Sequence, residues 1–423
     1  MGKIHLKIYQ WILRAAVEIL DLFPPRRIDL EEFALRKGVV PADVQIPESG
    51  TIWVHGASLG EVITLRPFLT ELGKLYGRQR IVCTATTLDG LRQLKRDELC
   101  GYAALLPIEL PALTVPFIDR IRPKIMLISE TEIWPLLLDT LARKGVPYGI
   151  INGRLNEKSV RLMRLAWSIF EPAISNMSFV FPQEKQYQRR FRILGVPAVR
   201  QQQLGCFKYD IAESPPDIDA LRRKFGIPPS RPLICFGSTH PGEEGMILDA
   251  LESLWPTLDA TVVLAPRHIK RVPEVEELLK ARSLDYEKVS EATAAARRVI
   301  LVDTMGELRS FYAASSLVFV GGSLIKRGGH NLMEPAAFAR PMLTGPHTFN
   351  FRYEMMALLR AKAIKTVNNS EELSQAMTDW LANPEEFIAM GQRSKQVLHS
   401  MAGASQRTIT SLQQLGLLPP SNA

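Results

Sequence analysis

Three glutamates in the first half of this 423-residue sequence follow apolar segments closely enough to do chemistry at a strand end. Glu61 lies in the predicted first turn of a helix, for which Ser58 is a plausible N-cap. Glu130 and Glu132 come directly after the apolar segment 125–129. A partly desolvated carboxylate in such a position can act as a general base toward a hydroxyl group. The alternative for Glu61 is that it only favours the helix dipole, an effect of roughly 0.3–1 kcal/mol.

The pair Glu130 and Glu132 needs a partner, because two neighbouring carboxylates at a strand end are costly to desolvate alone. Glu130 is nearer the strand end and is the better active-site candidate, whereas Glu132 could cap the following helix. Arg154 follows a later apolar segment, and its planar guanidinium suits a phosphate or a carboxylate. A salt bridge between Arg154 and Glu130 is the equal alternative.

A second candidate site follows the apolar segment 317–320, which Gly321 and Gly322 end. A basic loop leads from there to a predicted helix over 332–339, whose start would offer free N–H groups and a positive dipole end to an anion. Glu334, one turn into that helix, could accept hydrogen bonds from two neighbouring sugar hydroxyls. The alternative is an ordinary strand-turn-helix with a basic surface loop.

Three further strand ends in the second half also carry polar residues. Ser238 and His240 follow one apolar segment, Arg267 and His268 follow the next, and the loop 305–308 follows a third. Arg267 is placed to meet a phosphate, and the loop backbone could edge a nucleobase. Because four strand ends would converge on one anionic ligand, a nucleotide site is the favoured interpretation.

The elements that position these residues alternate between strand and helix. The predicted strands are residues 51–55, 81–86, 125–129, 148–152 and 179–181 in the first half, and 233–236, 261–265, 299–302 and 317–320 in the second. This alternation indicates parallel sheets with helices on both faces and ligands at the carboxyl ends of the strands. The chain length favours two domains, and the proline-rich stretch 215–229 marks the linker.

We therefore expect an α/β fold with two doubly wound, Rossmann-like domains. An N-terminal helix and connector would occupy residues 1–44, a first domain residues 45–212 and a second domain residues 213–423. The last helix could pack back on the first domain.

The net charge of +8 and the pI near 9.3 favour acidic partners: an anionic membrane, a phosphorylated substrate or nucleic acid. Nucleic acid ranks last, because the sequence has no basic tract interleaved with aromatic residues. The four cysteines are scattered, which is typical of reduced thiols in the cytosol.

Residues 4–23 predict a helix that Pro24-Pro25 ends and that is about long enough to cross a bilayer. Its charged residues, which argue against crossing, are Lys7, Arg14, Glu18 and Asp21. Its apolar residues on one face are Ile4, Ile8, Trp11, Ala15, Ile19 and Leu22. Such a helix lies in an anionic membrane interface or packs on its own domain, and the sequence leaves both open.

The motifs at these strand ends, taken together and in order, resemble one known family. They are His55-Gly-Ala-Ser-Leu-Gly-Glu61, Glu130-Thr-Glu-Ile-Trp-Pro135, Asn152-Gly-Arg-Leu155, Gly205-Cys-Phe-Lys-Tyr-Asp210, Ser238-Thr-His240, Pro266-Arg-His268, Asp303-Thr-Met-Gly-Glu-Leu308, Gly321-Gly-Ser-Leu324, Arg327-Gly-Gly-His-Asn331 and Gly345-Pro-His-Thr-Phe-Asn-Phe351. This set resembles the 3-deoxy-D-manno-octulosonic acid (Kdo) transferases of Gram-negative lipopolysaccharide synthesis. One departure is Leu332, where the family usually has a proline.

The resemblance implies a GT-B glycosyltransferase whose two domains face a cleft, with CMP-Kdo as donor and a lipid A precursor as acceptor. It also implies inversion at the anomeric carbon, no bound metal or other cofactor, and a place at the cytoplasmic side of the inner membrane. Glu61 matches the general base, and Glu130 matches a second active-site carboxylate. The residues expected around the donor are Arg267, His268, Met305, Gly306, Leu308, Asn331 and Glu334. Further sugar or acceptor contacts are expected from Ser58, Gly60, Arg154, Lys208, Ser238, His240, Lys326 and Arg327.

Two other functions compete with this interpretation. One is a sugar-nucleotide epimerase of similar two-domain build, which needs no lipid. The other is a catalytically silent, membrane-associated binding protein, against which the presence of Glu61 argues.

Overall fold

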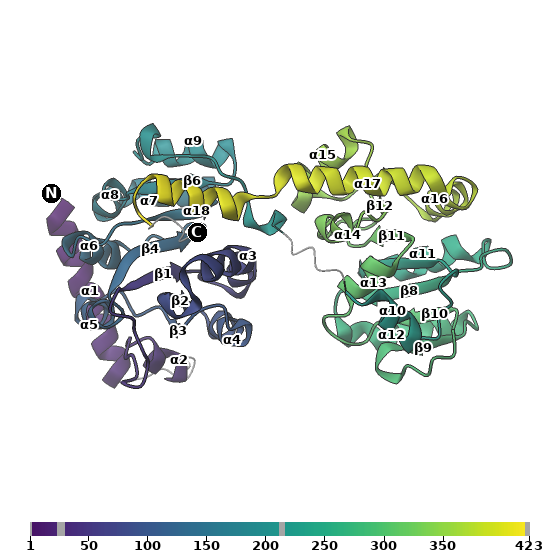
Figure 1. The fold of residues 1–423 in the computed structure, drawn as a ribbon, viewed down its shortest axis with the longest axis horizontal. Helices are drawn as coiled ribbons and strands as arrows, with labels where there is room; N and C mark the ends of the chain where they lie inside the picture. The colour runs from purple at the N-terminus through teal and green to yellow at the C-terminus, as the bar shows by residue number, and fades with distance from the viewer. Residues whose placement is uncertain (1, 23–29, 211–215, 419–423) are drawn as a thin grey trace. The chain divides into compact units, whose positions relative to one another are not determined.

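The computed structural model describes residues 2–22, 30–210 and 216–418, and the chain forms two compact units (Figure 1). Unit 1 comprises residues 1–210 and 402–423, and unit 2 comprises residues 211–401. The predicted boundary between residues 212 and 213 and the predicted helix stop at Pro24-Pro25 lie outside the described residues.

Unit 1 is built on a six-stranded sheet in which every neighbouring pair is parallel. Its strands are β1 (Thr51–His55), β2 (Ile81–Ala85), β3 (Tyr102–Leu105), β4 (Pro123–Ser129), β5 (Tyr148–Gly153) and β6 (Phe179–Pro182). The strand order β3-β2-β1-β4-β5-β6 is that of a doubly wound sheet, in which the order of the parallel strands switches between β1 and β4. The sequence did not predict β3, a short edge strand whose first three residues are only half-buried.

Helices cover both faces of this sheet. They are α1 (Gly2–Leu22), α2 (Leu30–Leu35), α3 (Leu59–Tyr76), α4 (Leu88–Asp97), α5 (Pro111–Ile121), α6 (Pro135–Arg143), α7 (Glu157–Leu165), α8 (Trp167–Ser175), α9 (Lys185–Ile193) and α18 (Ala404–Gln414). Ile52 and Val54 of β1 enter one apolar core, and Trp53 between them enters the other. Because alternate residues of a strand point to opposite faces, this split explains why the buried strands are continuously apolar.

Unit 2 repeats the architecture with a seven-stranded parallel sheet. Its strands are β7 (Leu233–Thr239), β8 (Thr261–Pro266), β9 (Tyr286–Lys288), β10 (Val299–Leu301), β11 (Leu317–Val320), β12 (Met342–Thr344) and β13 (Lys365–Thr366), in the order β13-β12-β11-β7-β8-β10-β9. Its helices are α10 (Ile218–Lys224), α11 (Glu243–Glu252), α12 (Val272–Ala281), α13 (Leu308–Ala314), α14 (Met333–Ala337), α15 (Arg352–Arg360), α16 (Ser370–Ala382) and α17 (Pro384–Met401). The predicted fold of two doubly wound α/β domains is confirmed.

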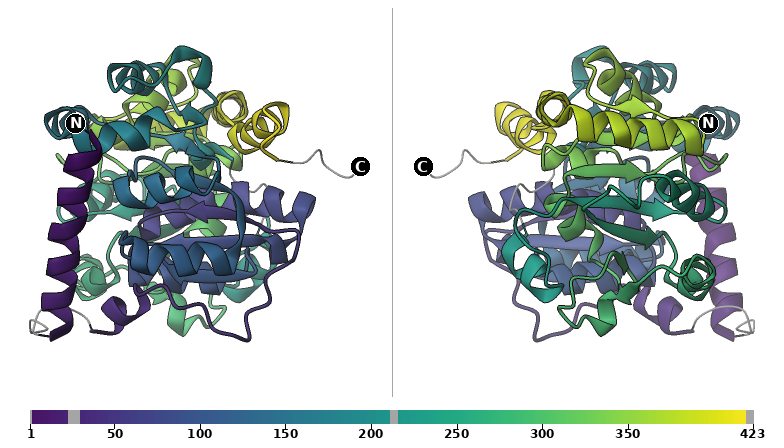
Figure 2. Two further views of the ribbon diagram at one scale, coloured as in Figure 1. Left: turned by 90° about the vertical axis from the view of Figure 1, so that its left-hand side faces the viewer. Right: turned by 90° about the vertical axis from the view of Figure 1, so that its right-hand side faces the viewer.

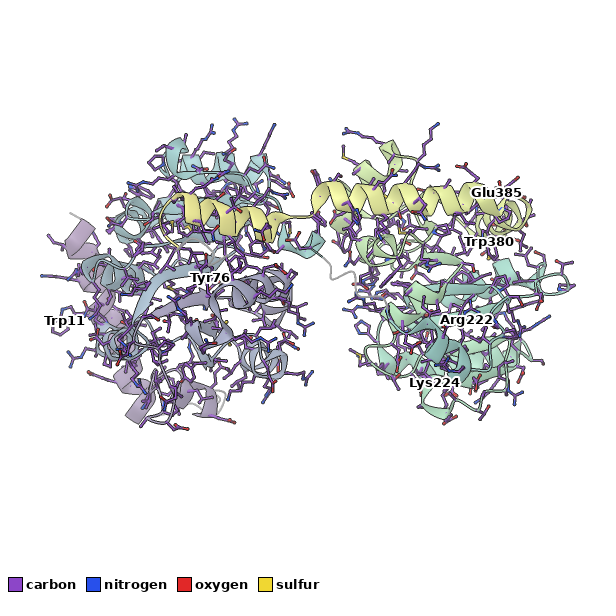
Figure 3. All side chains as sticks on the ribbon, viewed as in Figure 1. Trp11, Tyr76, Arg222, Lys224, Trp380 and Glu385 are labelled. Carbon is purple, nitrogen blue, oxygen red and sulfur yellow. The ribbon has the colours of Figure 1, made fainter. Side chains whose placement is uncertain are left out.

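Helix α1 runs along the outside of unit 1 (Figure 2) and packs against α8 and α6. Leu6 on one face is buried, and Tyr9 and Leu13 on that face are half-buried. The opposite face carries the exposed Ile4, Ile8, Trp11 and Ile19 of the predicted apolar face, and Trp11 lies at the surface, 72% exposed (Figure 3). Among the described residues, no helix combines the length and the apolar character needed to cross a bilayer.

The last helix of the chain, α18, is fastened to unit 1 by Asp210. The Asp210 carboxylate accepts hydrogen bonds from the N–H groups of Gly403 (2.5 Å), Ala404 (3.2 Å) and Ser405 (2.7 Å). These are groups at the start of a helix that have no partner within the helix. Ile409 and Leu412 of α18 then enter the apolar core beside α3.

Replacing Asp210 with alanine should destabilise unit 1 by about 2 kcal/mol, because three N–H groups lose a charged acceptor. Urea unfolding and hydrogen exchange of the α18 amides measure this loss. Asp217→Ala is the matched control, since Asp217 caps α10 through a single bond from Ala220 N–H and its loss should cost only about 1 kcal/mol. Unchanged α18 exchange in Asp210→Ala would contradict the assignment.

Candidate active site

Glu61 is held at the carboxyl end of β1 by the turn that starts α3. Ser58 is the N-cap of α3, as predicted, and its Oγ accepts from Glu61 N–H (3.4 Å). The Glu61 carboxylate accepts in return from Ala57 N–H (3.0 Å) and from the Ser58 hydroxyl (3.3 Å). This reciprocal arrangement resembles a capping box. The side chain therefore has a fixed direction, and Gly60 beside it is exposed.

Glu130 and Glu132 lie beyond the neighbouring strand β4, and both are half-buried. Burial and the nearby charge of Glu61 raise the pKa of Glu130 to about 6, against the opposing charges of Arg154 and Lys208. Burial and Glu61 likewise raise the pKa of Glu132 to about 7. Burial also raises the pKa of Glu61. Three carboxylates at one sheet edge therefore repel each other's charge, and the cluster holds a proton near neutral pH.

The backbone around these carboxylates is unusual. Glu130 has a φ of +57° and Asn152, at the end of β5, has a φ of +51°, which non-glycine residues rarely adopt. The buried Asn152 side chain accepts from Phe207 N–H (3.1 Å). This bond ties the segment that carries Lys208 to the end of β5, so that its charge acts on Glu130.

The structure corrects the role suggested for Glu132. Helix α6 is capped by Glu109, whose carboxylate accepts from the N–H groups of Leu136 (2.7 Å) and Leu137 (3.4 Å). Glu109 follows β3 and is 27 residues from Leu136 in the chain, so sequence spacing did not reveal the contact. Glu132 is thus free of the capping role and belongs to the carboxylate cluster.

In unit 2, the buried Glu243 joins the ends of β7 and β11. Its carboxylate accepts from the N–H groups of His240 (3.0 Å), Gly322 (2.6 Å), Ser323 (2.9 Å) and Leu324 (2.9 Å). The strand order switches between these two parallel strands, which is where doubly wound sheets bind ligands. Sequence reasoning did not assign Glu243 a role.

The glycines of this loop allow a close approach of two chain segments. A Cβ on Gly321 would lie 2.7 Å from the carbonyl oxygen of Ser238, and Gly322 has a φ of +69°. Both positions therefore require glycine for the loop to reach Glu243. Ser238 itself has a φ of +57°.

Three histidines gather at the same strand ends. His240 Nε2 lies 2.8 Å from His330 Nε2 with the rings parallel, and His268 meets His240 edge-on at 5.7 Å between centroids. Burial and the nearby positive charge, including that of Arg267, lower the pKa of His330 to about 4. Burial, then the charge of Arg327, lowers the pKa of His240 as well. Both rings are neutral at pH 7, so one donates a hydrogen bond to the other.

Asn331 and Glu334 form a second polar pair. Asn331 Nδ2 donates to Glu334 (3.0 Å), while Asn331 Oδ1 accepts from Met333 N–H (3.0 Å). The predicted helix over 332–339 is only α14, and one of its expected free N–H groups is occupied by Asn331. Burial raises the pKa of Glu334, and Asn331 and Arg267 oppose the rise.

The remaining predicted donor residues lie in loops at carboxyl ends of unit 2 strands. Arg267 and His268 follow β8 and are exposed. Met305, 79% exposed, and Gly306, with a φ of +91°, lie in the loop before Leu308, the first residue of α13. Two more exposed residues, Lys326 and Arg327, lie between β11 and α14. Within residues 2–22, 30–210 and 216–418, no group of His, Cys, Asp or Glu is arranged to hold a metal ion.

Comparison with known proteins gives the same result from the family model and from curated relatives. The family model described as 3-deoxy-D-manno-octulosonic-acid transferase (kdotransferase) matches residues 31–211. The chain is 32% identical over 420 residues to the 3-deoxy-D-manno-octulosonic acid transferase of Haemophilus influenzae, covering 96% of each chain. It is 29% identical over 424 residues to the protein of the same name from Bordetella pertussis, covering 96% of this chain and 95% of the other.

Among solved structures, the UDP-GlcNAc 2-epimerase of Neisseria meningitidis bound to UDP-GlcNAc matches with a TM-score of 0.58. The match covers 86% of this chain and 100% of the other at 15% identity. At that identity the likeness shows the GT-B fold alone, and it does not favour the epimerase alternative. With 32% identity along nearly its whole length, this chain belongs to the 3-deoxy-D-manno-octulosonic acid transferase family, glycosyltransferases of lipopolysaccharide biosynthesis.

Proposed function

We propose that the protein moves Kdo from CMP-Kdo to a lipid A precursor with inversion at the anomeric carbon, and that Glu61 is the general base. The observation that carries this proposal is the Glu61 carboxylate, fixed by Ala57 N–H and Ser58 at a strand end and raised in pKa by burial. A base with raised proton affinity and a fixed direction suits removal of a proton from an acceptor hydroxyl. Inversion requires only this one base, on the face opposite the leaving group.

Glu130 and Glu132 support Glu61 by their charge. With pKa values of about 6 and 7, the two carboxyls share the negative charge of the cluster near neutral pH. The positive charges of Arg154 and Lys208 lower the pKa of Glu130, and in our proposal they also meet the acidic groups of the acceptor or donor.

The donor belongs to unit 2 in this proposal. Arg267 would contact the phosphate of CMP, with His268 beside it, and Glu334 would accept from the ribose hydroxyls. The loop from Met305 to Leu308 would border the base. As the bond to Kdo breaks, charge grows on the departing phosphate, and the positive charge of Arg267 would stabilise it.

We further propose that the protein lies on the anionic cytoplasmic surface of the inner membrane through α1. Its outer face exposes 51–72% of the side chains of Ile4, Ile8, Trp11, Ile12 and Ile19. An apolar stripe of this kind on a helix that is anchored along its other face suits an interfacial position. Helices α7 and α9 add exposed basic residues on the same unit, among them Arg161, Arg164 and Arg189.

Glu61→Gln should lower the transfer rate by about 10²–10⁴-fold, because the amide cannot take a proton. The amide oxygen still accepts from Ala57 N–H, so α3 should remain intact and CMP binding unchanged. Turnover with CMP-Kdo and tetraacylated lipid A precursor, together with calorimetric CMP binding, measures both quantities. Glu71→Gln, on the same helix as Glu61, is the control, and near-normal turnover of Glu61→Gln would refute the base assignment.

Arg267→Ala should give the reverse pattern of Glu61→Gln, with CMP affinity about 10–100-fold weaker.

Glu132→Gln should stabilise the protein by about 1–2 kcal/mol at pH 8 and leave its stability unchanged at pH 4. The folded pKa of about 7 lies above the ordinary 4.5, so the folded state holds the proton more tightly. The wild type therefore loses stability as pH rises from about 4.5 through 7, and the glutamine variant does not. Urea unfolding at both pH values tests this, with the exposed Glu48→Gln as control. An equal effect at both pH values would contradict the raised pKa.

Trp11→Glu should release the protein from vesicles that contain anionic phospholipid, because a charge replaces an exposed apolar side chain on the outer face of α1. Vesicle flotation measures the bound fraction. Tyr353→Glu, at an exposed aromatic residue of α15 in unit 2, is the control and should remain bound. Equal flotation of the two variants would show that α1 does not contact the membrane.

A further inference from the structure

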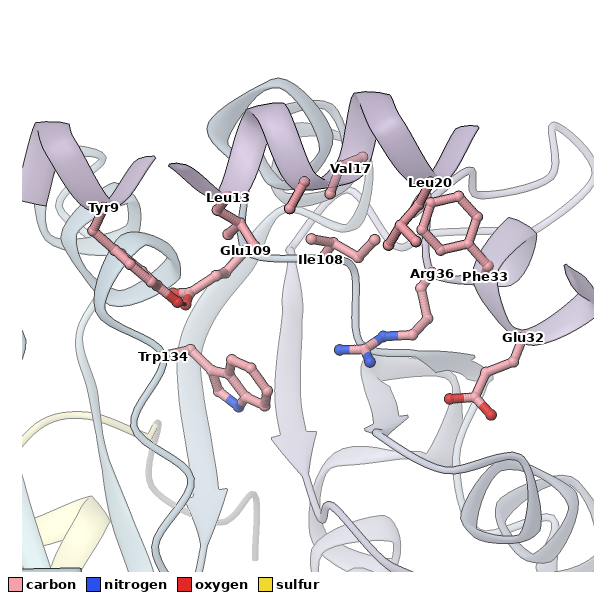
Figure 4. Close-up of a pocket in the computed structure, with 11 residues that line it drawn as sticks. Tyr9, Leu13, Val17, Leu20, Glu32, Phe33, Arg36, Ile108, Glu109 and Trp134 are labelled. Atoms are coloured by element: carbon pink, nitrogen blue, oxygen red, sulfur yellow. Dashed lines mark hydrogen bonds between the residues drawn. The ribbon is translucent and has the colours of Figure 1, made fainter. Parts of the chain in front are cut away.

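A groove of about 550 Å³ lies in unit 1 between α1, α2 and the loops after β3 and β4 (Figure 4). Its apolar lining comes from Leu13, Val17, Leu20, Phe33, Ile108 and Trp134. The volume is within the range of small-molecule sites, and such sites are mostly apolar with a few placed polar groups. The mechanism proposed above makes no use of this groove.

A hydrogen bond between Tyr9 and Glu109 closes one part of the groove. Tyr9 of α1 donates to the Glu109 carboxylate (2.5 Å), which is 3% exposed and also caps α6. The charge of Glu109 is therefore already satisfied by Tyr9 and by backbone N–H groups. This end does not demand a cation. The other two charged lining residues, Glu32 and Arg36, have opposite charges, and the rest of the lining favours an apolar occupant.

Another part of the groove borders the carboxylate cluster. Arg36 and Trp134 both line the groove, and both lower the pKa of Glu132. Arg36 is anchored by its Nε–H, which donates to the Leu106 carbonyl (3.3 Å). The groove therefore lies next to the sheet edge that carries the carboxylate cluster, and the side chains of Arg36 and Trp134 lie between the two.

Helix α1 has apolar side chains on both sides of its axis. Leu13, Val17 and Leu20 line the groove, while Trp11 and Ile19 are exposed on the outer face. Only α1 thus separates a lipid layer at its outer face from the groove, so an acyl chain would have to pass one helix to enter.

We propose that the groove binds one acyl chain of the lipid acceptor. The bound chain would then position the sugar of the same lipid molecule toward Glu61. This inference rests on the proposed function and adds to it a recognition site for the lipid part of the acceptor. The occupant is a fatty acyl chain, since most of the lining residues are apolar and the buried carboxylate of Glu109 is already paired.

Two adjacent alanines of α1 provide a matched pair for the test. Both are exposed at the surface of α1, but only Ala16 lines the groove. Ala16→Phe should lower kcat/KM for the acylated acceptor at least tenfold. Ala15→Phe should not lower it, because it keeps the outer face of α1 apolar and does not enter the groove. Ile108→Phe, which narrows the groove from the opposite wall, should repeat the loss without altering α1. Identical kinetics of the Ala15 and Ala16 variants, with Ile108→Phe also normal, would overturn the proposal.

Binding is measured separately from transfer with a dibrominated long-chain fatty acid, which quenches nearby tryptophan fluorescence. A Trp11→Phe background removes the outer-face tryptophan of α1. The probe should quench emission in this background and in its Ala15→Phe derivative, but not after Ala16→Phe or Trp134→Phe. If the wild type transfers no Kdo yet the quenching pattern holds, the proposed function fails and the acyl site stands. If the wild type transfers Kdo and all variants quench equally, the acyl site fails alone.

Discussion

The carboxylate of Glu243 is the interaction on which the candidate donor site depends. A buried charge costs several kcal/mol unless hydrogen bonds replace its water, and here four backbone N–H groups do so. Three of them belong to the loop 322–324, so this loop can take its shape only around the carboxylate. That shape fixes the space beside Gly322 into which His240 and His330 fit.

In unit 1, side chains likewise accept hydrogen bonds from backbone N–H groups near strand ends, but the residues differ. Ser58 and Glu61 satisfy the start of α3, Glu109 satisfies the start of α6, and Asn152 binds Phe207 N–H. Glu61 stabilises the start of α3 and is also the candidate general base, two roles that the sequence offered as alternatives. The two are compatible, because a carboxylate has two oxygens and enough acceptor sites for both. The crowding of Glu61 with Glu130 and Glu132 lowers stability, and such costs are typical of functional sites.

The sequence predicted the strands that are continuously apolar, because segments such as 51–55 and 317–320 report burial on both faces. It missed β3, β9 and β13, which are only partly buried, and β12, which has three residues. The strand-end residues were found because parallel sheets bring carboxyl ends to one edge. Glu243 and Glu109 were missed because all their partners except His240 lie 27 to 100 residues away in the chain, beyond any local spacing rule.

Unit 2 is an insertion within unit 1, and the bond between Asp210 and the start of α18 joins the two points where the chain leaves and re-enters unit 1. The chain leaves unit 1 after residue 210 and re-enters it at residue 402, and Asp210 Oδ1 lies only 2.5 Å from Gly403 N. Excising the inserted residues would leave two ends that a very short peptide could join, rather than a gap the width of a domain. The first unit is therefore topologically complete in itself, and its carboxylate cluster can be studied on a chain of about half the present length.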